Sequence, residues 1–128
     1  MSKVLGIGGV FFKTADPAAL RAWYLRVLGL EIPDWGCFFT PDAVAAKPGS
    51  GTVFSPFKAD TDYFAPSEKE FMFNFIVDDM DGMLARCAKE GVTPIKKQDE
   101  SYGRFAHIMD LEGRKVELWE PKEMPAQS

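Results

Sequence analysis

The chain has 128 residues, which is the size of one domain and is long enough to bury a substantial core. Its net charge is −4 at pH 7 and its charges are interspersed, so we expect neither nucleic acid nor an anionic membrane as a partner. No apolar run reaches the roughly 18 residues of a membrane-spanning helix, and the sequence does not begin like a signal peptide. Two cysteines far apart in sequence do not make a disulfide framework, so we expect a cytoplasmic protein with reduced thiols.

The first half of the chain predicts one helix among short strands. Leu5–Lys13 is apolar and starts with glycines, which favours a strand over a phosphate-binding loop because no helix and no Lys-Ser/Thr pair follow. Asp16 and Pro17 are typical of an N-cap and a first helical position, and the apolar spacing predicts a helix over Pro17–Leu28 that Gly29 ends. Further short strands are predicted at Leu30–Ile32, Gly36–Thr40 and Thr52–Phe57.

Residues 58–69 are polar and separate two halves with the same order of elements. We interpret this segment as a linker, which could also supply binding groups as a flap. Glu70–Val77 alternates and predicts a strand, and Asp78-Asp79 begins a helix over Met80–Lys89 that Gly91 ends. Three strands are then predicted at Thr93–Lys97, Arg104–Met109 and Lys115–Glu120.

The chain is therefore predicted to be one α+β domain, residues 1–128, built from two tandem β-α-β-β-β modules. Module one covers about residues 5–57 and module two about residues 70–121. In each module the helix covers one face of the sheet and leaves the other face open. We expect the two open faces to combine into a curved, partly closed mixed sheet around a cavity.

The last predicted strand carries the most informative pattern. Val116 and Leu118 alternate with Glu117 and Trp119, so a core on one side of the strand places Glu117 on the other side. In an isolated strand such a polar face is usually solvated. The repeat of modules instead predicts that Glu117 lines the cavity.

Several motifs together resemble one known family. The first helix carries Asp-Pro-x-x-Leu-x-x-Trp-Tyr, the second helix starts with Phe-x-Val-Asp-Asp-Met-Asp, and the chain closes with Asp-x-Glu-Gly-x-x-x-Glu-Leu-Trp-Glu-Pro. With the paired modules, these motifs resemble the vicinal oxygen chelate superfamily, which includes glyoxalase I, bleomycin-resistance proteins, fosfomycin-resistance transferases and extradiol dioxygenases. The resemblance covers roughly residues 5 to 121 and implies a glyoxalase-like fold.

The resemblance also implies where a metal would bind. Enzymes of the superfamily carry His, Gln or Glu ligands in the first and last strands of each module, which here correspond to Gly9, Met72, Thr52 and Glu117. Only Glu117 is a matching ligand, and a catalytic Zn²⁺ site needs about three protein ligands. We therefore predict no metal cofactor; the alternative is a divalent metal such as Zn, Ni, Mn or Fe at Glu117.

His107 is the single histidine of the chain. A five-residue loop from Asp110 to Arg114 would pair it with Glu117 across a hairpin, and an imidazole beside a carboxylate can form an acid–base pair near neutral pH. The alternatives are a structural His–Glu hydrogen bond, or a solvent-facing histidine if the turn is one residue shorter.

Two functions follow, and the sequence leaves open whether the protein is an enzyme. We favour a non-enzymatic protein that binds a small molecule, as the bleomycin-resistance branch does. The alternative is a glyoxalase-like lyase or dioxygenase that uses a divalent metal, or Glu117 and His107 as catalytic residues. The exposed aromatic run Trp35–Phe39 and the habits of the family predict a homodimer. The predicted ligand-binding residues are Phe11, Phe54, Met72, Asn74, His107, Glu117 and Trp119.

Overall fold

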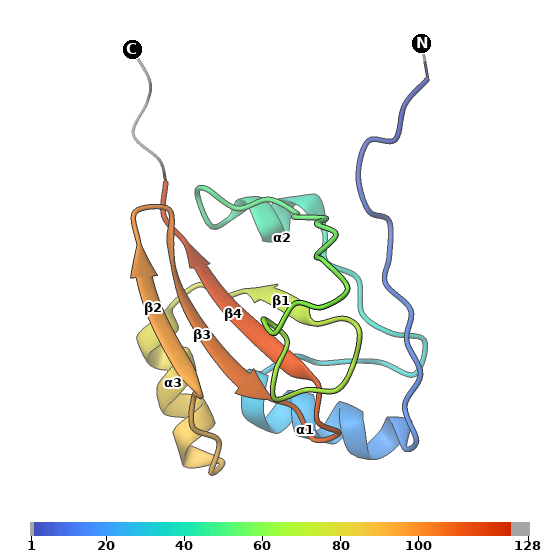
Figure 1. Cartoon of the computed structure of the whole chain (residues 1–128), viewed down its shortest axis with the longest axis vertical. Helices are drawn as coiled ribbons and strands as arrows, with labels where there is room; N and C mark the ends of the chain where they lie inside the picture. Colours follow the sequence, from blue (N-terminus) through green and yellow to red (C-terminus); the bar gives the residue numbers. More distant parts are fainter. Residues whose placement is uncertain (1, 124–128) are drawn as a thin grey trace.

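The structure is a computed structural model that describes residues 2–123 (Figure 1). Its elements in chain order are α1 (Pro17–Leu28), α2 (Pro41–Ala45), β1 (Phe73–Ile76), α3 (Met80–Lys89), β2 (Lys96–Glu100), β3 (Gly103–Met109) and β4 (Lys115–Pro121). The strands form one sheet in the order β1-β4-β3-β2. β1 runs parallel to β4, whereas β2, β3 and β4 are antiparallel neighbours. The fold is thus α+β with a mixed sheet that is not closed into a barrel.

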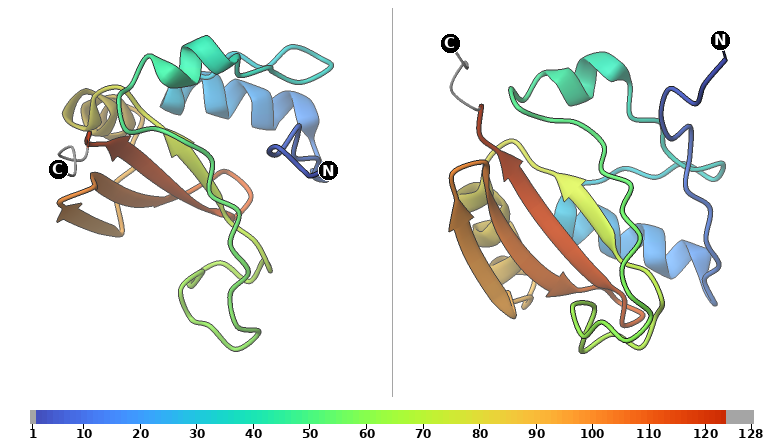
Figure 2. Two further views of the ribbon diagram at one scale, coloured as in Figure 1. Left: turned by 90° about the horizontal axis from the view of Figure 1, so that it is seen from above. Right: turned by 45° about the horizontal axis from the view of Figure 1, so that its top comes forward.

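The core lies on one face of this sheet. Helices α1 and α3 both pack on this face, behind the strands in Figure 1 and above them in the left view of Figure 2. Ile108, Val116 and Leu118 are fully buried there, and burying each such side chain stabilises the fold by about 1.5–3 kcal/mol. The helices contribute Leu20, Trp23, Tyr24, Val27, Leu28, Met80 and Cys87 to the same core.

Both predicted long helices are confirmed with their predicted bounds. The Asp16 side chain accepts a hydrogen bond from the Ala19 amide at 3.1 Å, and Pro17 is the first helical residue of α1. Gly29 ends α1 at φ 69°, a left-handed conformation that glycine adopts without steric cost. Local capping residues therefore fix the ends of α1.

The second half forms the predicted order of strand, helix and three strands. The bounds differ because a strand extends only as far as it has a partner. β1 covers Phe73–Ile76 of the predicted Glu70–Val77, opposite Val116–Trp119. β2 covers Lys96–Glu100 rather than Thr93–Lys97, since the tight turn to β3 moves the pairing toward Glu100.

The first half differs from the prediction. Among residues 2–72, the segments predicted as strands at Leu5–Lys13, Leu30–Ile32, Gly36–Thr40 and Thr52–Phe57 form no ladder with another strand. Between two of these segments the chain forms the short helix α2, where the Thr40 hydroxyl accepts a hydrogen bond from the Ala43 amide at 3.0 Å. Alternation alone does not make a strand, because an extended segment needs a free edge to pair with. Within the described residues, no helix and no second sheet therefore packs on the other face of the sheet.

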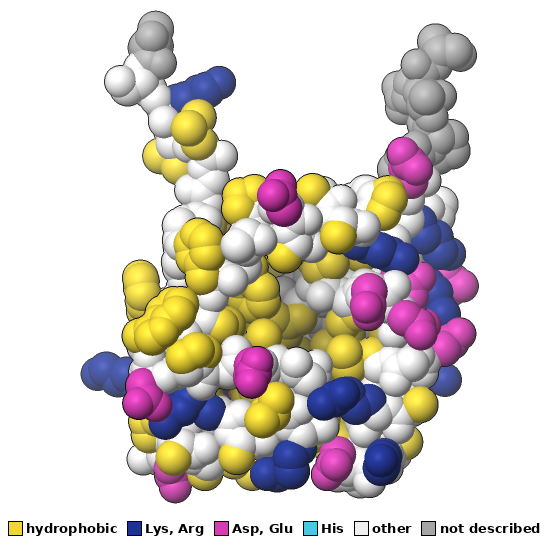
Figure 3. Space-filling model, turned by 180° about the vertical axis from the view of Figure 1, so that it is seen from behind, with side chains coloured by type: hydrophobic (Ala, Val, Ile, Leu, Met, Phe, Trp, Pro, Cys, Tyr) yellow, Lys and Arg dark blue, Asp and Glu magenta, His cyan; other side chains and the backbone are white. Residues whose placement is uncertain are grey.

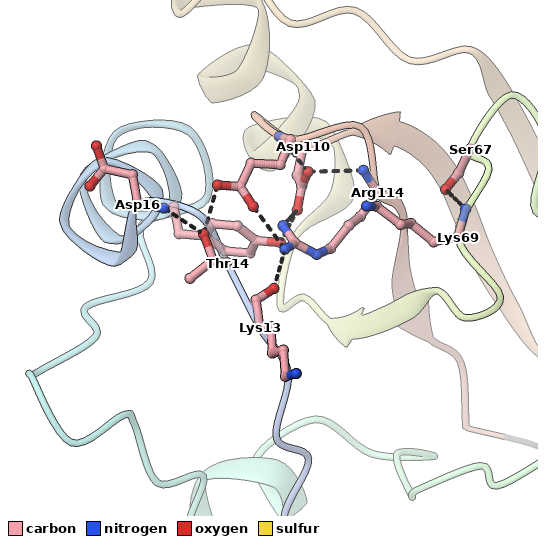
Figure 4. Close-up of polar contacts among 9 residues, drawn as sticks. Lys13, Thr14, Asp16, Ser67, Lys69, Asp110 and Arg114 are labelled. Atoms are coloured by element: carbon pink, nitrogen blue, oxygen red, sulfur yellow. Dashed lines mark hydrogen bonds and ion pairs between the residues drawn. The ribbon is translucent and has the colours of Figure 1, made fainter.

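The turn between β3 and β4 holds the first half against the sheet (Figure 4). The buried Asp110 carboxylate accepts hydrogen bonds from the Tyr24 hydroxyl at 2.9 Å and from the Arg114 guanidinium at 3.1 Å. It also accepts from the backbone amides of Glu112 and Arg114 at 2.8 and 3.0 Å. This single carboxylate thus shapes the turn and fixes α1 to it.

Arg114 and Glu112 extend this contact to the segment before α1 (Figure 4). Arg114 donates to the Lys13 carbonyl and to the Glu112 carboxylate, both at 2.8 Å. The Thr14 hydroxyl donates to the other oxygen of Glu112 at 2.6 Å, and the Phe12 ring lies 4.9 Å from the Arg114 guanidinium. We refer to Tyr24, Asp110, Glu112 and Arg114 as the turn clamp.

Within the described residues no helix is long and apolar enough to span a bilayer.

Candidate functional site

The open face of the sheet carries the residues that the strand pattern of β3 and β4 turns away from the helices. In β3 these are Phe105 and His107, and in β4 they are Glu117 and Trp119. No helix covers this face, which points toward the viewer in Figure 1. The linker 58–69 lies over one end of it, on the side of the sheet opposite α1 and α3 (Figure 2). Polar side chains are therefore gathered under a loop.

Glu117 is the centre of this group. Its register partners are Asn74 on β1 and His107 on β3, so it lies between two strands. One carboxylate oxygen, Oε2, accepts from the Tyr63 hydroxyl at 2.6 Å and lies 2.7 Å from His107 Nε2. The other, Oε1, accepts from the Asn74 amide at 2.7 Å. Both oxygens of a carboxylate that is only 9% exposed are thus hydrogen-bonded.

These contacts determine the charge of the site. Burial alone would raise the pKa of Glu117, but the hydrogen bonds from His107, Tyr63 and Asn74 outweigh it and hold the pKa below its usual value. Glu117 is therefore ionised at neutral pH. Three neighbouring donors compensate its charge, so the buried carboxylate needs no ligand cation.

His107 is 3% exposed and faces Glu117 through Nε2. An ionised carboxylate only accepts hydrogen bonds, so Nε2 carries the proton in this contact. The other ring nitrogen, Nδ1, is buried and has no hydrogen-bond partner in the part of the chain that the structure describes. The predicted cross-hairpin pairing of His107 with Glu117 is present, and the solvent-facing alternative is not.

Tyr63 belongs to the linker and was not among the predicted site residues. Its ring meets His107 edge to face at 5.4 Å, and the Lys115 and Lys96 ammonium nitrogens lie 5.0 and 5.9 Å from the ring centroid. The Lys115 ammonium also donates to the Tyr63 carbonyl at 2.5 Å. Burial and the Glu117 carboxylate raise the pKa of the Tyr63 hydroxyl, which keeps it a proton donor. The only sequence signal is the aromatic pair Tyr63 and Phe64 in an otherwise polar segment.

An aromatic pair continues the open face beyond the polar group. The rings of Phe105 and Trp119 are stacked, with 6.2 Å between centroids and an interplanar angle of 1°. The indole lies directly against Gly103, where a side chain would collide with its Nε1 and Cδ1 atoms. Glycine at this position therefore lets Trp119 lie flat across β3.

The structure brings only part of the predicted site together. Asn74, His107 and Glu117 are in contact, and Trp119 lies on the same face. Phe11 and Phe54 are 95% and 86% exposed in extended segments, so one chain does not bury them in a site. Met72 is half-buried and lies just before β1.

A second hollow lies on the helix side of the sheet. It has a volume of about 300 Å³ between the end of α1, α2, β1 and α3, and Figure 3 shows this face hollowed and lined by hydrophobic side chains. Its lining is mostly apolar, including Leu28, Leu30, Ala43, Phe75 and Met83. Because it offers few polar groups to orient a ligand, the open face remains the better candidate site.

Comparison with known proteins identifies the family. Residues 9–119 match the glyoxalase-like domain. The chain belongs to this family, within the vicinal oxygen chelate superfamily. No curated protein matches the chain.

Solved structures also resemble this glyoxalase-like domain. A structure from the mobile metagenome of V. Pseudocholerae is 17% identical, with 96% of this chain and 99% of that chain covered and a TM-score of 0.61. TnmS3, an antibiotic binding protein from Streptomyces sp. CB03234, is 26% identical over 40% of this chain, with a TM-score of 0.37. The match spans 44% of TnmS3, less than half of its length. TioX from Micromonospora sp. ML1 is 20% identical, with 90% and 94% covered and a TM-score of 0.49. The first of these shares the fold.

Metal ligands of the superfamily do not fit the residues of this glyoxalase-like domain. Among residues 2–123, no three His, Cys, Asp or Glu side chains lie together so that they could hold a metal ion. Gly9 has no ligand atom, Thr52 is exposed, and the Glu117 oxygens already accept three hydrogen bonds.

Proposed function

We propose that this glyoxalase-like domain binds a small molecule on the open face of its sheet, with Glu117 as the polar anchor and without a metal cofactor. The observation that carries the proposal is a buried, ionised carboxylate on a sheet face that no helix covers. Small-molecule sites combine a few oriented polar groups with aromatic walls. Here Asn74 and His107 orient Glu117, and the stacked Phe105 and Trp119 supply the wall.

A screen of small molecules tests whether this face binds a ligand. Small aromatic and heteroaromatic compounds are screened for those that raise the melting temperature of the full chain, and the best is titrated calorimetrically. We expect Glu117→Gln to weaken its binding at least about tenfold, since the charged acceptor contributes more than about 1.4 kcal/mol. Glu31→Gln is the control, because Glu31 is an exposed carboxylate in the first half. A ligand whose affinity is the same in both variants would contradict the proposal.

We also propose a homodimer in which a second copy covers exposed apolar side chains of the first half. Leu5, Phe11 and Phe54 are 91%, 95% and 86% exposed on unpaired extended segments. A single chain rarely leaves large apolar side chains and unpaired strand edges in water. Sedimentation at micromolar concentration is expected to give twice the mass of the chain, and a monomer alone would contradict it. A cytoplasmic location stays a prediction.

One observation favours an enzyme as the second candidate. The 2.7 Å contact between His107 Nε2 and Glu117 Oε2 forms a buried acid–base pair of the kind that general catalysis uses. In this case the protein would convert its ligand, as a glyoxalase-like lyase does, with His107 moving the proton and Glu117 orienting it. Mass spectrometry of the ligand after incubation separates the candidates. A product that forms with the natural chain and not with His107→Asn would make it an enzyme, and an unchanged ligand would leave it a binding protein.

A further inference from the structure

The linker 58–69 is hydrogen-bonded to the sheet through one residue, Tyr63, by its hydroxyl and its backbone carbonyl. In the part of the chain that the structure describes, every hydrogen bond between this linker and the sheet involves Tyr63. The remaining backbone hydrogen bonds of the linker close turns within it, from Thr61 to Lys58, from Ala65 to Asp62 and from Ser67 to Phe64. Most of its residues are exposed. The linker can therefore move away as a unit when the Tyr63 contacts are released.

The contacts of Tyr63 define a shape and a chemistry. Its hydroxyl donates to an ionised carboxylate at 2.6 Å and lies 3.4 Å from His107 Nε2. The ring lies near two ammonium groups, on Lys96 and Lys115, which favour an electron-rich aromatic ring. Phe57, a residue that precedes the linker, stacks on the ring at 5.4 Å and 23°, and Phe64 meets it edge to face at 6.4 Å. The groups around Tyr63 therefore suit a phenol: an acceptor for its hydroxyl and cations beside its ring.

We propose that Tyr63 is a built-in placeholder, and that the ligand of this protein is a phenol that takes over the place of the Tyr63 ring and hydroxyl on Glu117 and His107. This inference rests on the proposed binding function of the open face and names the ligand class. A carboxylate or phosphate ligand is disfavoured, because its charge would face Glu117. A hydrocarbon ring fits the shape but leaves the ionised oxygen without its donor.

A tethered phenol and a free phenol compete for the same place. A group on a short linker acts like a ligand at roughly millimolar effective concentration, so the natural chain binds a simple phenol weakly. Tyr63→Ala removes the competitor and leaves Glu117, His107 and both lysines in place. We expect it to bind p-cresol, the side-chain analogue of tyrosine, at least about tenfold more tightly than the natural chain does. If Tyr63 were instead a wall of the site, the same substitution would weaken binding.

The test is a titration of p-cresol and of toluene into the untagged natural chain, Tyr63→Ala, and Tyr63→Ala combined with Glu117→Gln. His107 is the only histidine, so its imidazole NMR signals report directly on ligand at this place. In Tyr63→Ala, p-cresol is expected to shift these signals and to bind at least about tenfold more tightly than toluene, because only p-cresol has the hydroxyl. Adding Glu117→Gln is expected to remove most of this difference.

Three outcomes would overturn the proposal: tighter p-cresol binding by the natural chain than by Tyr63→Ala, equal affinities for p-cresol and toluene, or no p-cresol binding by any variant. If Tyr63→Ala does not fold, Tyr63→Phe replaces it, since it keeps the ring and loses the hydroxyl contact; p-cresol must then bind it more tightly than the natural chain. The proposed binding function is judged separately. A screened ligand that still depends on Glu117 while p-cresol fails removes the phenol class and leaves the binding site.

Discussion

Both faces of strand β4 carry buried side chains, and the two faces are stabilised in opposite ways. Val116 and Leu118 on the helix face are fully buried among apolar side chains. Lys115 and Glu117 on the open face are 6% and 9% exposed, yet every charge there has a hydrogen-bond partner. The first face is stabilised by removing apolar area from water, and the second by directional contacts that a loop residue completes. On the open face a ligand can therefore take the place of the loop residue Tyr63.

The largest expected effect concerns the helix face. Leu118→Ala removes a fully buried side chain and leaves a cavity, which costs about 2–5 kcal/mol of the free energy of unfolding. Urea denaturation followed by circular dichroism measures it. Leu25→Ala is the matched control, because Leu25 lies on α1 but is 46% exposed. Equal losses for the two variants would mean that β4 has no buried apolar face.

Glu117→Gln is expected to cost about 1–3 kcal/mol, because it replaces a charged acceptor of three donors by a neutral amide. Since the pKa of Glu117 is lowered in the folded state, its contribution is present above the ordinary value of 4.5 and is lost as the pH falls through the folded pKa below it. The variant should therefore lose less stability on acidification. Denaturation at a series of pH values below 5 tests this, and parallel curves for both chains would contradict it.

Gly103→Ala is a smaller change in the aromatic part of the open face. The added methyl collides with the Trp119 indole, so the ring must tilt off Phe105. We expect a cost of about 1 kcal/mol, the lower end of the range for overpacking, and a changed near-ultraviolet dichroism signal. Gly91→Ala does not serve as a control, because an alanine would be strained at the φ of 79° that Gly91 adopts. Gly51 has open space around it. Gly51→Ala should leave the aromatic signal unchanged.

Tyr63→Phe has the smallest expected effect. It removes one hydroxyl from Glu117, which His107 and Asn74 still contact, and should cost about 1 kcal/mol or less. The change is expected in dynamics more than in stability: amide hydrogen exchange should become faster in residues 58–69 and stay the same in β4. Faster exchange throughout the sheet would show that Tyr63 supports the fold as a whole.

The sequence predicts those parts of this molecule that depend on neighbours in the chain. Asp16, Pro17 and Gly29 cap α1 through contacts within a few residues, so its bounds could be predicted. The alternation of β4 and the length of the Asp110–Arg114 loop likewise predicted that His107 faces Glu117.

What could not be predicted depends on contacts between distant residues. The hydrogen bond from Tyr63 to Glu117 spans 54 residues, and no periodicity in the linker marks it. The four strands predicted in the first half have the right composition, but a strand exists only if another edge accepts it, and the sequence of Leu5–Lys13 does not say which edge that is. The strand residues of the site, His107 and Glu117, can therefore be predicted from the alternation of their strands, whereas the loop residue Tyr63 cannot.

The turn clamp has a consequence for how the protein is made. Tyr24 and Asp110 are 86 residues apart, and the Lys13 carbonyl and Arg114 are 101 apart, so the turn clamp forms only after the turn between β3 and β4 has been synthesised. A nascent chain that stops before residue 110 lacks β4, whose Val116 and Leu118 belong to the core that buries the apolar stripe of α1. Such long-range contacts slow folding and expose intermediates to aggregation. Among the described elements β4 is therefore the last to join the core, and the core is complete only after β4 has been synthesised.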